Sequence, residues 1–163
     1  MLSIITVIVL TGSDGGVAPL SLDGTLIRSG PITLAELEAL GPITADWTDK
    51  KGSHRVKGVR LDKLLLARGF SEGVTGPKAD PKQKHAGLRS AIVATARDGF
   101  KAVFAVGELL ETLGATQALI VWEVDGKPLP DTAGPFRMVV TTDKLPSRSL
   151  HQVERFELVD LNR

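Results

Sequence analysis

The stretch that decides the fold of this chain is residues 119–140, LIVWEVDGKPLPDTAGPFRMVV. Two runs in it, 119–124 and 136–140, are rich in the β-branched and aromatic residues typical of strands. Asp-Gly, Lys-Pro, Pro-Asp and Gly-Pro pairs lie between them, and such pairs end regular structure because Gly allows positive φ and Pro has no amide proton. We predict two strands facing each other across a rigid polar connection, with Arg137 where the chain re-enters the sheet.

The remaining segments alternate between strand-like and helix-like patterns. TLAE at 33–36 has capping-box spacing, in which Thr33 caps a helix and Glu36 reaches back to it; Leu34, Leu37 and Leu40 would face inward. We predict further strands at 1–10, 43–47, 54–58, 88–96, 100–106 and 153–159, and a short irregular or strand segment at 18–23. We also predict helices at 34–40, 60–68 and 107–113, and a surface loop at 73–87. Mainly antiparallel strands with a few short helices make an α+β pattern, which we assign to one domain spanning 1–163.

Composition excludes several classes of function. With 20 basic and 19 acidic residues the net charge is +1, which gives no reason to expect nucleic acid as a partner. The chain has no cysteine, so disulfides, thiolate metal sites and cysteine nucleophiles are excluded. Its three histidines lack ligand spacing, and no Ser or carboxylate lies in a catalytic motif. We therefore predict neither a metal site nor catalytic residues.

The apolar residues 1–10 resemble a signal peptide at first sight. They lack a positively charged start and a small-residue cleavage site, and they are too few to span a bilayer. We interpret the chain as a mature domain without direct membrane insertion.

Four segments have the motif spacing of a known family. WEVDGKPLP at 122–130 matches aromatic-acidic-x-Asn/Asp-Gly-x-Pro-Leu-Pro, and GPFRMVV at 134–140 matches Gly-(x)-Pro-x-Arg-x-Val-Val, in which the residue between Gly and Pro is optional. ARDGF at 96–100 is similar to Ser-x-Asp-Gly-Tyr, and GVRLDKLL at 58–65 to Gly-Val-x-Leu-x-x-Leu-Leu. From about residue 33 onward the chain thus resembles the sulfite-oxidase-like molybdopterin-binding domain. The resemblance implies mixed, mainly antiparallel sheets with short helices and a cleft for a pterin.

Arg137 and the segment SRSLH at 147–151 are the main candidates for ligand binding. From residue type alone, Arg137 would pair with an acid on the solvent face. In the family the arginine at this place contacts the cofactor, and a guanidinium can match a phosphate or a pterin edge bidentately. The second segment resembles the family's Arg-x-Val-Lys, which implies ligand contacts for Arg148, Ser149 and His151. His151 replaces a lysine, so a titrating group stands where a permanent charge is usual. We expect Arg137 and Arg148 to share one hollow.

Trp47 and Asp98 are further candidates. Trp47 lies in the region where catalytic members carry the metal-binding cysteine; its indole can stack on a flat heterocycle or pack into the core, and we favour stacking. We assign Trp122 to the core. Asp98 can accept hydrogen bonds from a pterin, but an Asp-Gly hairpin turn is the stronger interpretation.

Three functions remain open. The first is a non-catalytic pterin-binding module, without metal, that is exported to the periplasm and signals to a membrane-bound cyclic-di-GMP enzyme, as the resemblance implies. The second is a molybdopterin-dependent oxidoreductase, or a subunit of one, whose metal is held without cysteine. The third is a structural domain with a vestigial cleft. We predict the first, because a soft metal in this class prefers thiolate and none is present.

Overall fold

A computed structural model of the chain describes residues 20–71 and 85–161. The strand predicted at 1–10 and most of the loop predicted at 73–87 lie outside these residues. The strands are β1 (Ser21–Gly24), β2 (Gly30–Pro31), β3 (Ile43–Asp49), β4 (Gly52–Arg60), β5 (Ser90–Ala96), β6 (Lys101–Ala105), β7 (Ala118–Val124), β8 (Lys127–Pro128), β9 (Arg137–Val140) and β10 (Val153–Asp160). The helices are α1 (Leu34–Ala39), α2 (Leu61–Ala67), α3 (Ala86–Arg89), α4 (Val106–Leu109) and the 3-10 turn η1 (Pro146–Arg148). In this part of the chain, no helix has the length and apolar character needed to cross a membrane.

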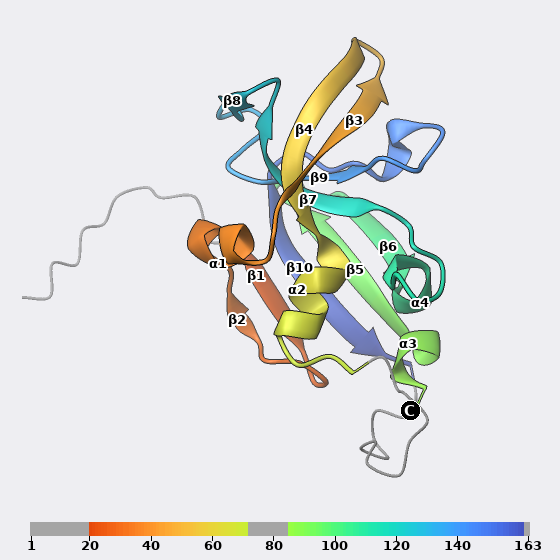
Figure 1. Cartoon of the computed structure of the whole chain (residues 1–163). Helices are drawn as coiled ribbons and strands as arrows, with labels where there is room; N and C mark the ends of the chain where they lie inside the picture. The colour runs from red at the N-terminus through yellow and green to blue at the C-terminus, as the bar shows by residue number, and fades with distance from the viewer. Residues whose placement is uncertain (1–19, 72–84, 162–163) are drawn as a thin grey trace, which may run out of the picture.

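The strands form two sheets (Figure 1). The first has the order β2-β1-β10-β5-β6, and the second has the order β3-β4-β7-β8, with β9 also paired to β7. Among the described strands only β1 and β10 pair in parallel; the other pairings are antiparallel. The predicted α+β class, with mixed, mainly antiparallel sheets and short helices, is confirmed.

The predicted central pair of strands is present as β7 and β9. Ile120 lies opposite Met138, and Val121 lies opposite Arg137. Successive side chains of a strand point to opposite faces, so Ile120 and Met138 enter the main core, while Val121 and Val139 join a smaller cluster around Trp47. Arg137 is two residues before Val139 and therefore lies on the face of the smaller cluster.

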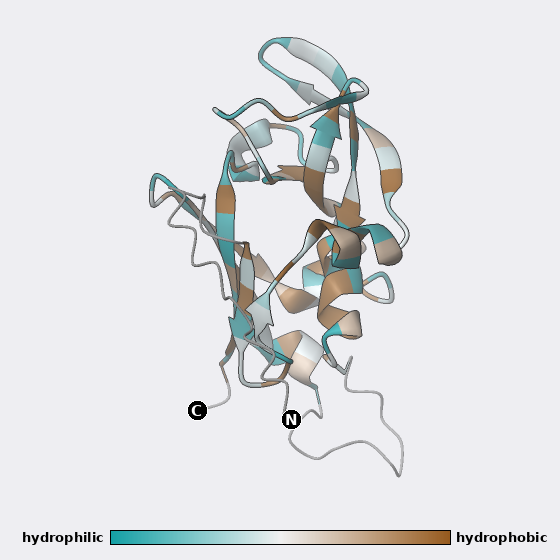
Figure 2. Cartoon of the chain, turned by 90° about the vertical axis from the view of Figure 1, so that its left-hand side faces the viewer, coloured by the Kyte–Doolittle hydropathy of each residue, from teal (hydrophilic) through white to brown (hydrophobic). Residues whose placement is uncertain are grey.

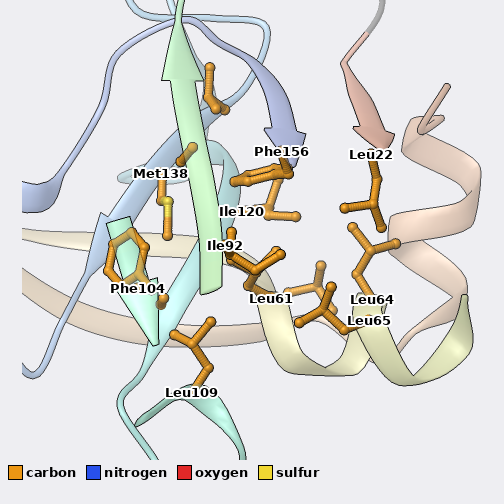
Figure 3. Close-up of a cluster of buried hydrophobic side chains, with 14 of the residues drawn as sticks. Leu22, Leu61, Leu64, Leu65, Ile92, Phe104, Leu109, Ile120, Met138 and Phe156 are labelled. Carbon is orange, nitrogen blue, oxygen red and sulfur yellow. The ribbon is translucent and has the colours of Figure 1, made fainter. Parts of the chain in front are cut away.

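The main core fills the space between the first sheet, the second sheet and α2. Figure 3 shows α2 side chains meeting strand residues of both sheets; the labelled members are Leu22, Leu61, Leu64, Leu65, Ile92, Phe104, Leu109, Ile120, Met138 and Phe156. Buried and more exposed residues alternate along β5 and β6, whereas all four residues of β9 are buried; Figure 2 shows where apolar residues lie on the strands and helices. The inward positions predicted for α2 are confirmed, and Trp122 is part of this core as predicted.

Helix α1 begins as predicted but differs in two details. The Thr33 Oγ accepts a hydrogen bond from the Glu36 amide at 3.2 Å, which is the cap. The Glu36 carboxylate does not return to Thr33; it accepts hydrogen bonds from Arg68 Nε at 2.6 Å and Nη2 at 2.7 Å. Leu34 is 42% exposed rather than inward, because a six-residue helix buries only its central Leu37.

Arg68 connects three segments that are distant in sequence. It is 9% exposed and, besides Glu36, donates hydrogen bonds to the carbonyl oxygens of Arg28 and Pro31. The hydrogen bonds from Arg68 lower the pKa of Glu36. The guanidinium thus joins the end of α2 to the start of α1 and to the edge strand β2.

Replacing Arg68 tests this connection. Arg68→Ala leaves Glu36 and two carbonyl groups without their donors, and we expect it to lower the free energy of unfolding by about 2–3 kcal/mol. Arg97→Ala is the matched control, because it removes an exposed pair with Glu154 and should cost at most about 1 kcal/mol. Urea unfolding of both variants measures the difference. Equal losses would show that the Arg68 contacts do not stabilise the fold.

Candidate functional site

The hairpin of β3 and β4 extends beyond the rest of the second sheet (Figure 1). On one side lies the connection that follows β8, and a cavity of about 550 Å³ separates its residues 129–133 from the hairpin. An adjoining cavity of about 240 Å³ extends toward η1. Both cavities are lined by Trp47, Asp49, Lys51, Arg137 and His151. We call the two together the hairpin cleft; the larger cavity is of the size that small ligands occupy.

Arg137 is the most unusual residue of the cleft. It is 7% exposed, and its Nε has no hydrogen-bond partner. Its Cζ lies 4.5 Å from the centroid of the Trp47 ring, a cation–π contact. No carboxylate within the described residues is at ion-pair distance, so pairing with a surface acid, the alternative from residue type, is wrong. Burial lowers the pKa of Arg137, although Asp49 opposes this.

An unpaired buried donor costs about 1–3 kcal/mol. Such a group is therefore unusual unless something else binds it. A ligand with acceptor atoms in the cleft would contact the Arg137 guanidinium, whose Nε is itself enclosed by protein. The arrangement suits a planar or anionic group that a guanidinium can bind with two parallel hydrogen bonds.

His151 and Ser149, which we predicted as ligand contacts, both line the cleft. The Nη2 of Arg137 lies 3.4 Å from His151 Nε2; arginine can only donate, so we assign the histidine proton to Nδ1. Partial burial lowers the pKa of His151, and the positive charges of Arg137 and Lys51 lower it further. The histidine is therefore neutral at pH 7, and the charge of the family's lysine is not replaced. Ser149 lines the smaller cavity, and its Oγ accepts a hydrogen bond from the Val140 amide at 3.4 Å.

Trp47 lines both cavities, but the prediction of a free stacking surface needs correction. The residue is 5% exposed and packs with Val56 and Val121 in the smaller hydrophobic cluster. Arg137 covers one face of the ring. The indole therefore packs in the smaller hydrophobic cluster, contacts the Arg137 guanidinium and forms part of the cleft wall. The two alternatives left open by the sequence, core packing and a place in the site, both apply.

Arg148 does not share the hollow with Arg137, and this prediction is wrong. Its Nε and Nη2 donate to Asp143 at 2.8 and 2.7 Å, and its Nη1 donates to Glu108 at 2.9 Å. Its guanidinium also lies 4.7 Å from the centroid of Phe104. Arg148 lines neither cavity of the cleft. Its donors anchor the 141–148 loop to α4 instead.

Asp98 also lies outside the cleft lining. Its Oδ1 accepts a hydrogen bond from the Phe100 amide at 2.9 Å in the turn between β5 and β6. The hairpin-turn interpretation accounts for this residue.

A chain of three titratable groups on the cleft wall, Asp49, His54 and Asp125, was missed from sequence. His54 Nδ1 lies 2.9 Å from Asp125 Oδ2, and His54 Nε2 lies 3.3 Å from Asp49 Oδ1. The hydrogen bond with Asp125, together with the negative charges of both carboxylates, raises the pKa of His54. Asp125 also accepts the Arg55 amide at 2.8 Å, which lowers its pKa. His54 lies opposite Trp47 in the hairpin register, so correct pairing of β3 and β4 would have indicated its position.

The donor set of the chain fits a pterin better than a protein-held metal. Arg137, Ser149 and His151 present polar groups to the cleft. No thiol exists anywhere in the sequence, and the described residues contain no group of three His, Asp or Glu side chains arranged to hold a metal ion.

Comparison with known proteins is informative at the level of family and fold. The family model described as "Oxidoreductase molybdopterin binding domain" matches residues 32–162. Among solved structures, the sulfane dehydrogenase SoxCD from Paracoccus pantotrophus is similar, with a TM-score of 0.63 and 13% identity. The match covers 88% of this chain and 38% of that chain, so the present chain spans under two fifths of the length of this structural relative. No curated protein matches the chain.

The raised pKa of His54 on the cleft wall predicts that the free energy of unfolding depends on pH. A raised pKa means that His54 stabilises the folded state fully below the ordinary histidine pKa of about 6.5, and that this contribution is lost as the pH rises through the folded value. From about pH 6 to about pH 9, the stability of the unmodified protein should therefore fall relative to that of His54→Gln. His151 acts in the opposite direction but is present in both proteins and cancels in the difference. Urea unfolding of both proteins across this pH range measures the difference in their free energies of unfolding. Parallel pH profiles would contradict a raised pKa for His54.

Proposed function

The chain belongs to the oxidoreductase molybdopterin-binding domain family, and from this premise we propose that it is a non-catalytic module that binds a reduced pterin in the hairpin cleft. One observation carries the proposal. A buried arginine, Arg137, lies on the cleft wall with its Nε unpaired, in a chain that has no thiol to bind molybdenum.

Arg137 supplies the recognition in this proposal. Its Nε has no hydrogen-bond partner, and its Cζ lies 4.5 Å from the centroid of the Trp47 ring. A pterin carries a ring oxygen and ring nitrogens on one edge, which such a fork of donors can bind in the plane of the ring. Neutral His151 can exchange hydrogen bonds with the ligand without repelling it, and the Ser149 hydroxyl is available on the same side.

Because the chain has no cysteine, we propose that it binds the pterin without supplying a protein ligand to molybdenum. A molybdopterin, when bound, supplies sulfur ligands and the redox chemistry of a molybdenum centre. The soft-metal preference for a further thiolate from the protein cannot be met by this sequence. The chain's own residues would therefore bind and orient the pterin and exclude water from one face.

We propose that this module acts as a sensor of its pterin ligand. The residues in the cleft suit ligand binding, and the described residues include no catalytic motif. The periplasm as compartment, and a membrane-bound cyclic-di-GMP enzyme as partner, rest on the family resemblance of the motifs at 122–130 and 134–140.

A second candidate is an oxidoreductase domain or subunit. The family model and the fold of a sulfane dehydrogenase favour it. The chain corresponds to 38% of that structure, so in this case it would form the cofactor-binding part of a larger assembly. A metal ligand would then have to come from the cofactor, from solvent or from another subunit.

The contents of the purified protein separate the two candidates. We expect the supernatant of the denatured protein to show pterin fluorescence, or the protein to take up added dihydroneopterin, with molybdenum well below one atom per chain by elemental analysis. Stoichiometric pterin and molybdenum together would instead establish the oxidoreductase. Failure to contain or bind any pterin would leave a structural domain.

Arg137→Ala tests the proposed recognition directly. We expect the dissociation constant for dihydroneopterin to rise by more than tenfold in calorimetry, since at least one charge-assisted hydrogen bond is lost. Arg137→Lys should lose nearly as much, because it keeps the charge but not the planar fork. Arg155→Ala, which removes an exposed arginine paired with Asp23, is the control and should bind normally. Unchanged affinity in Arg137→Ala would remove this residue from the site.

A further inference from the structure

The hairpin cleft contains a carboxylate as well as the Arg137 guanidinium. Asp49, the last residue of β3, lines both cavities that Arg137 lines. The two side chains do not form an ion pair, but their charges act on each other. Asp49 opposes the lowering of the Arg137 pKa by burial, and Arg137 contributes to a lowered pKa of Asp49. The cleft therefore presents a donor group and an acceptor group that no direct contact joins.

One of the two Asp49 carboxylate oxygens holds the side chain in place. Its Oδ1 accepts a hydrogen bond from the Lys51 amide at 2.7 Å, in the turn between β3 and β4, and lies 3.3 Å from His54 Nε2. The Lys51 amide lowers the pKa of Asp49, and the charges of His54 and Arg137 lower it further. At pH 7 the group is therefore ionised and can only accept hydrogen bonds. The other oxygen, Oδ2, has no hydrogen-bond partner within the described residues.

The other carboxylates near the cleft are less suited to bind a ligand beside Arg137. Asp125 lines the larger cavity, but both of its oxygens already contact protein nitrogens, one a backbone amide and the other a histidine nitrogen. Asp46 and Asp143 line a further cavity of about 350 Å³, which Arg137 does not line. Asp49 is thus the carboxylate that shares both Arg137 cavities and keeps an oxygen available.

A ligand that contacts both Arg137 and Asp49 must carry acceptors and donors at neighbouring positions, because a guanidinium only donates and an ionised carboxylate only accepts. A 2-amino-4-oxopyrimidine ring meets this requirement. Its 4-oxygen accepts hydrogen bonds, and the adjoining N3–H and 2-amino group donate them. In a 7,8-dihydropterin, N5 adds a second acceptor next to the 4-oxygen, so the guanidinium has two acceptors to bind.

We propose that Asp49 determines the specificity of the hairpin cleft by accepting hydrogen bonds from N3–H and the 2-amino group of the pterin, while Arg137 binds the 4-oxygen and N5. This inference rests on the proposed pterin binding and adds the residue that selects the amino group. Hydrogen bonds to an ionised acceptor are stronger than those between neutral groups. A ligand with an oxygen at position 2 would instead place two acceptors opposite each other.

A matched pair of ligands tests the proposal on the full chain. 7,8-Dihydroneopterin and the corresponding dihydrolumazine differ at position 2, where the lumazine has an oxygen in place of the amino group. We expect the pterin to bind at least about tenfold more tightly in calorimetry near neutral pH, because the lumazine leaves the buried acceptor of Asp49 without a donor.

Asp49→Asn should remove or reverse this preference. The asparagine Oδ1 can still accept the Lys51 amide, which leaves Nδ2 as a donor toward the ligand. That donor suits the lumazine oxygen and not the pterin amino group, so the ratio of the two dissociation constants should fall to about one or below. Retained lumazine binding shows that the variant is folded. Asp46→Asn is the matched control, because Asp46 lies on the same strand but is exposed and lines neither Arg137 cavity; it should keep the original ratio.

The outcomes separate this inference from the proposed function. Equal binding of the two ligands by the unmodified protein, or an unchanged ratio in Asp49→Asn, would overturn the role of Asp49 while leaving pterin binding intact. Guanosine carries the same donor and acceptor edge on a different ring, and tighter binding of guanosine than of dihydroneopterin would overturn a pterin as the source of this edge. Failure of both dihydroneopterin and the dihydrolumazine to bind would overturn the proposed function itself.

Discussion

The pairing of Val121 with Arg137 is the constraint on which the site depends. Because side chains alternate along a strand, this register sends Met138 and Val140 into the main core and turns Arg137 toward Trp47. A shift by one residue would bury the charge in the main core and move Met138 and Val140 to the face of the smaller cluster. The apolar residues of β9 therefore fix the arginine at the cleft, and no carboxylate among the described residues lies within ion-pair distance of it.

Local patterns were sufficient to predict the elements that place the site. The central strand pair, the Thr33 cap, the turn at Asp98 and the inward face of α2 each depend on residues close in sequence. The fates of particular side chains depend on distant partners. Arg148 contacts Glu108, forty residues away, and His54 contacts Asp125, 71 residues away. No rule based on sequence spacing predicts contacts between residues so far apart. For this reason the sequence analysis assigned Arg148 to ligand binding and did not identify His54.

The position of β10 in the first sheet affects how the chain can assemble during synthesis. This strand lies between β1 and β5, which have no pairing of their own, and it is formed by residues 153–160. While these residues are still inside the ribosome, β1 and the β5–β6 hairpin have no common strand to pair with. The second sheet, complete by residue 140, can form earlier. Among the described strands β10 is the last to be synthesised, so the sheet that carries the ligand cleft can form before the first sheet is complete.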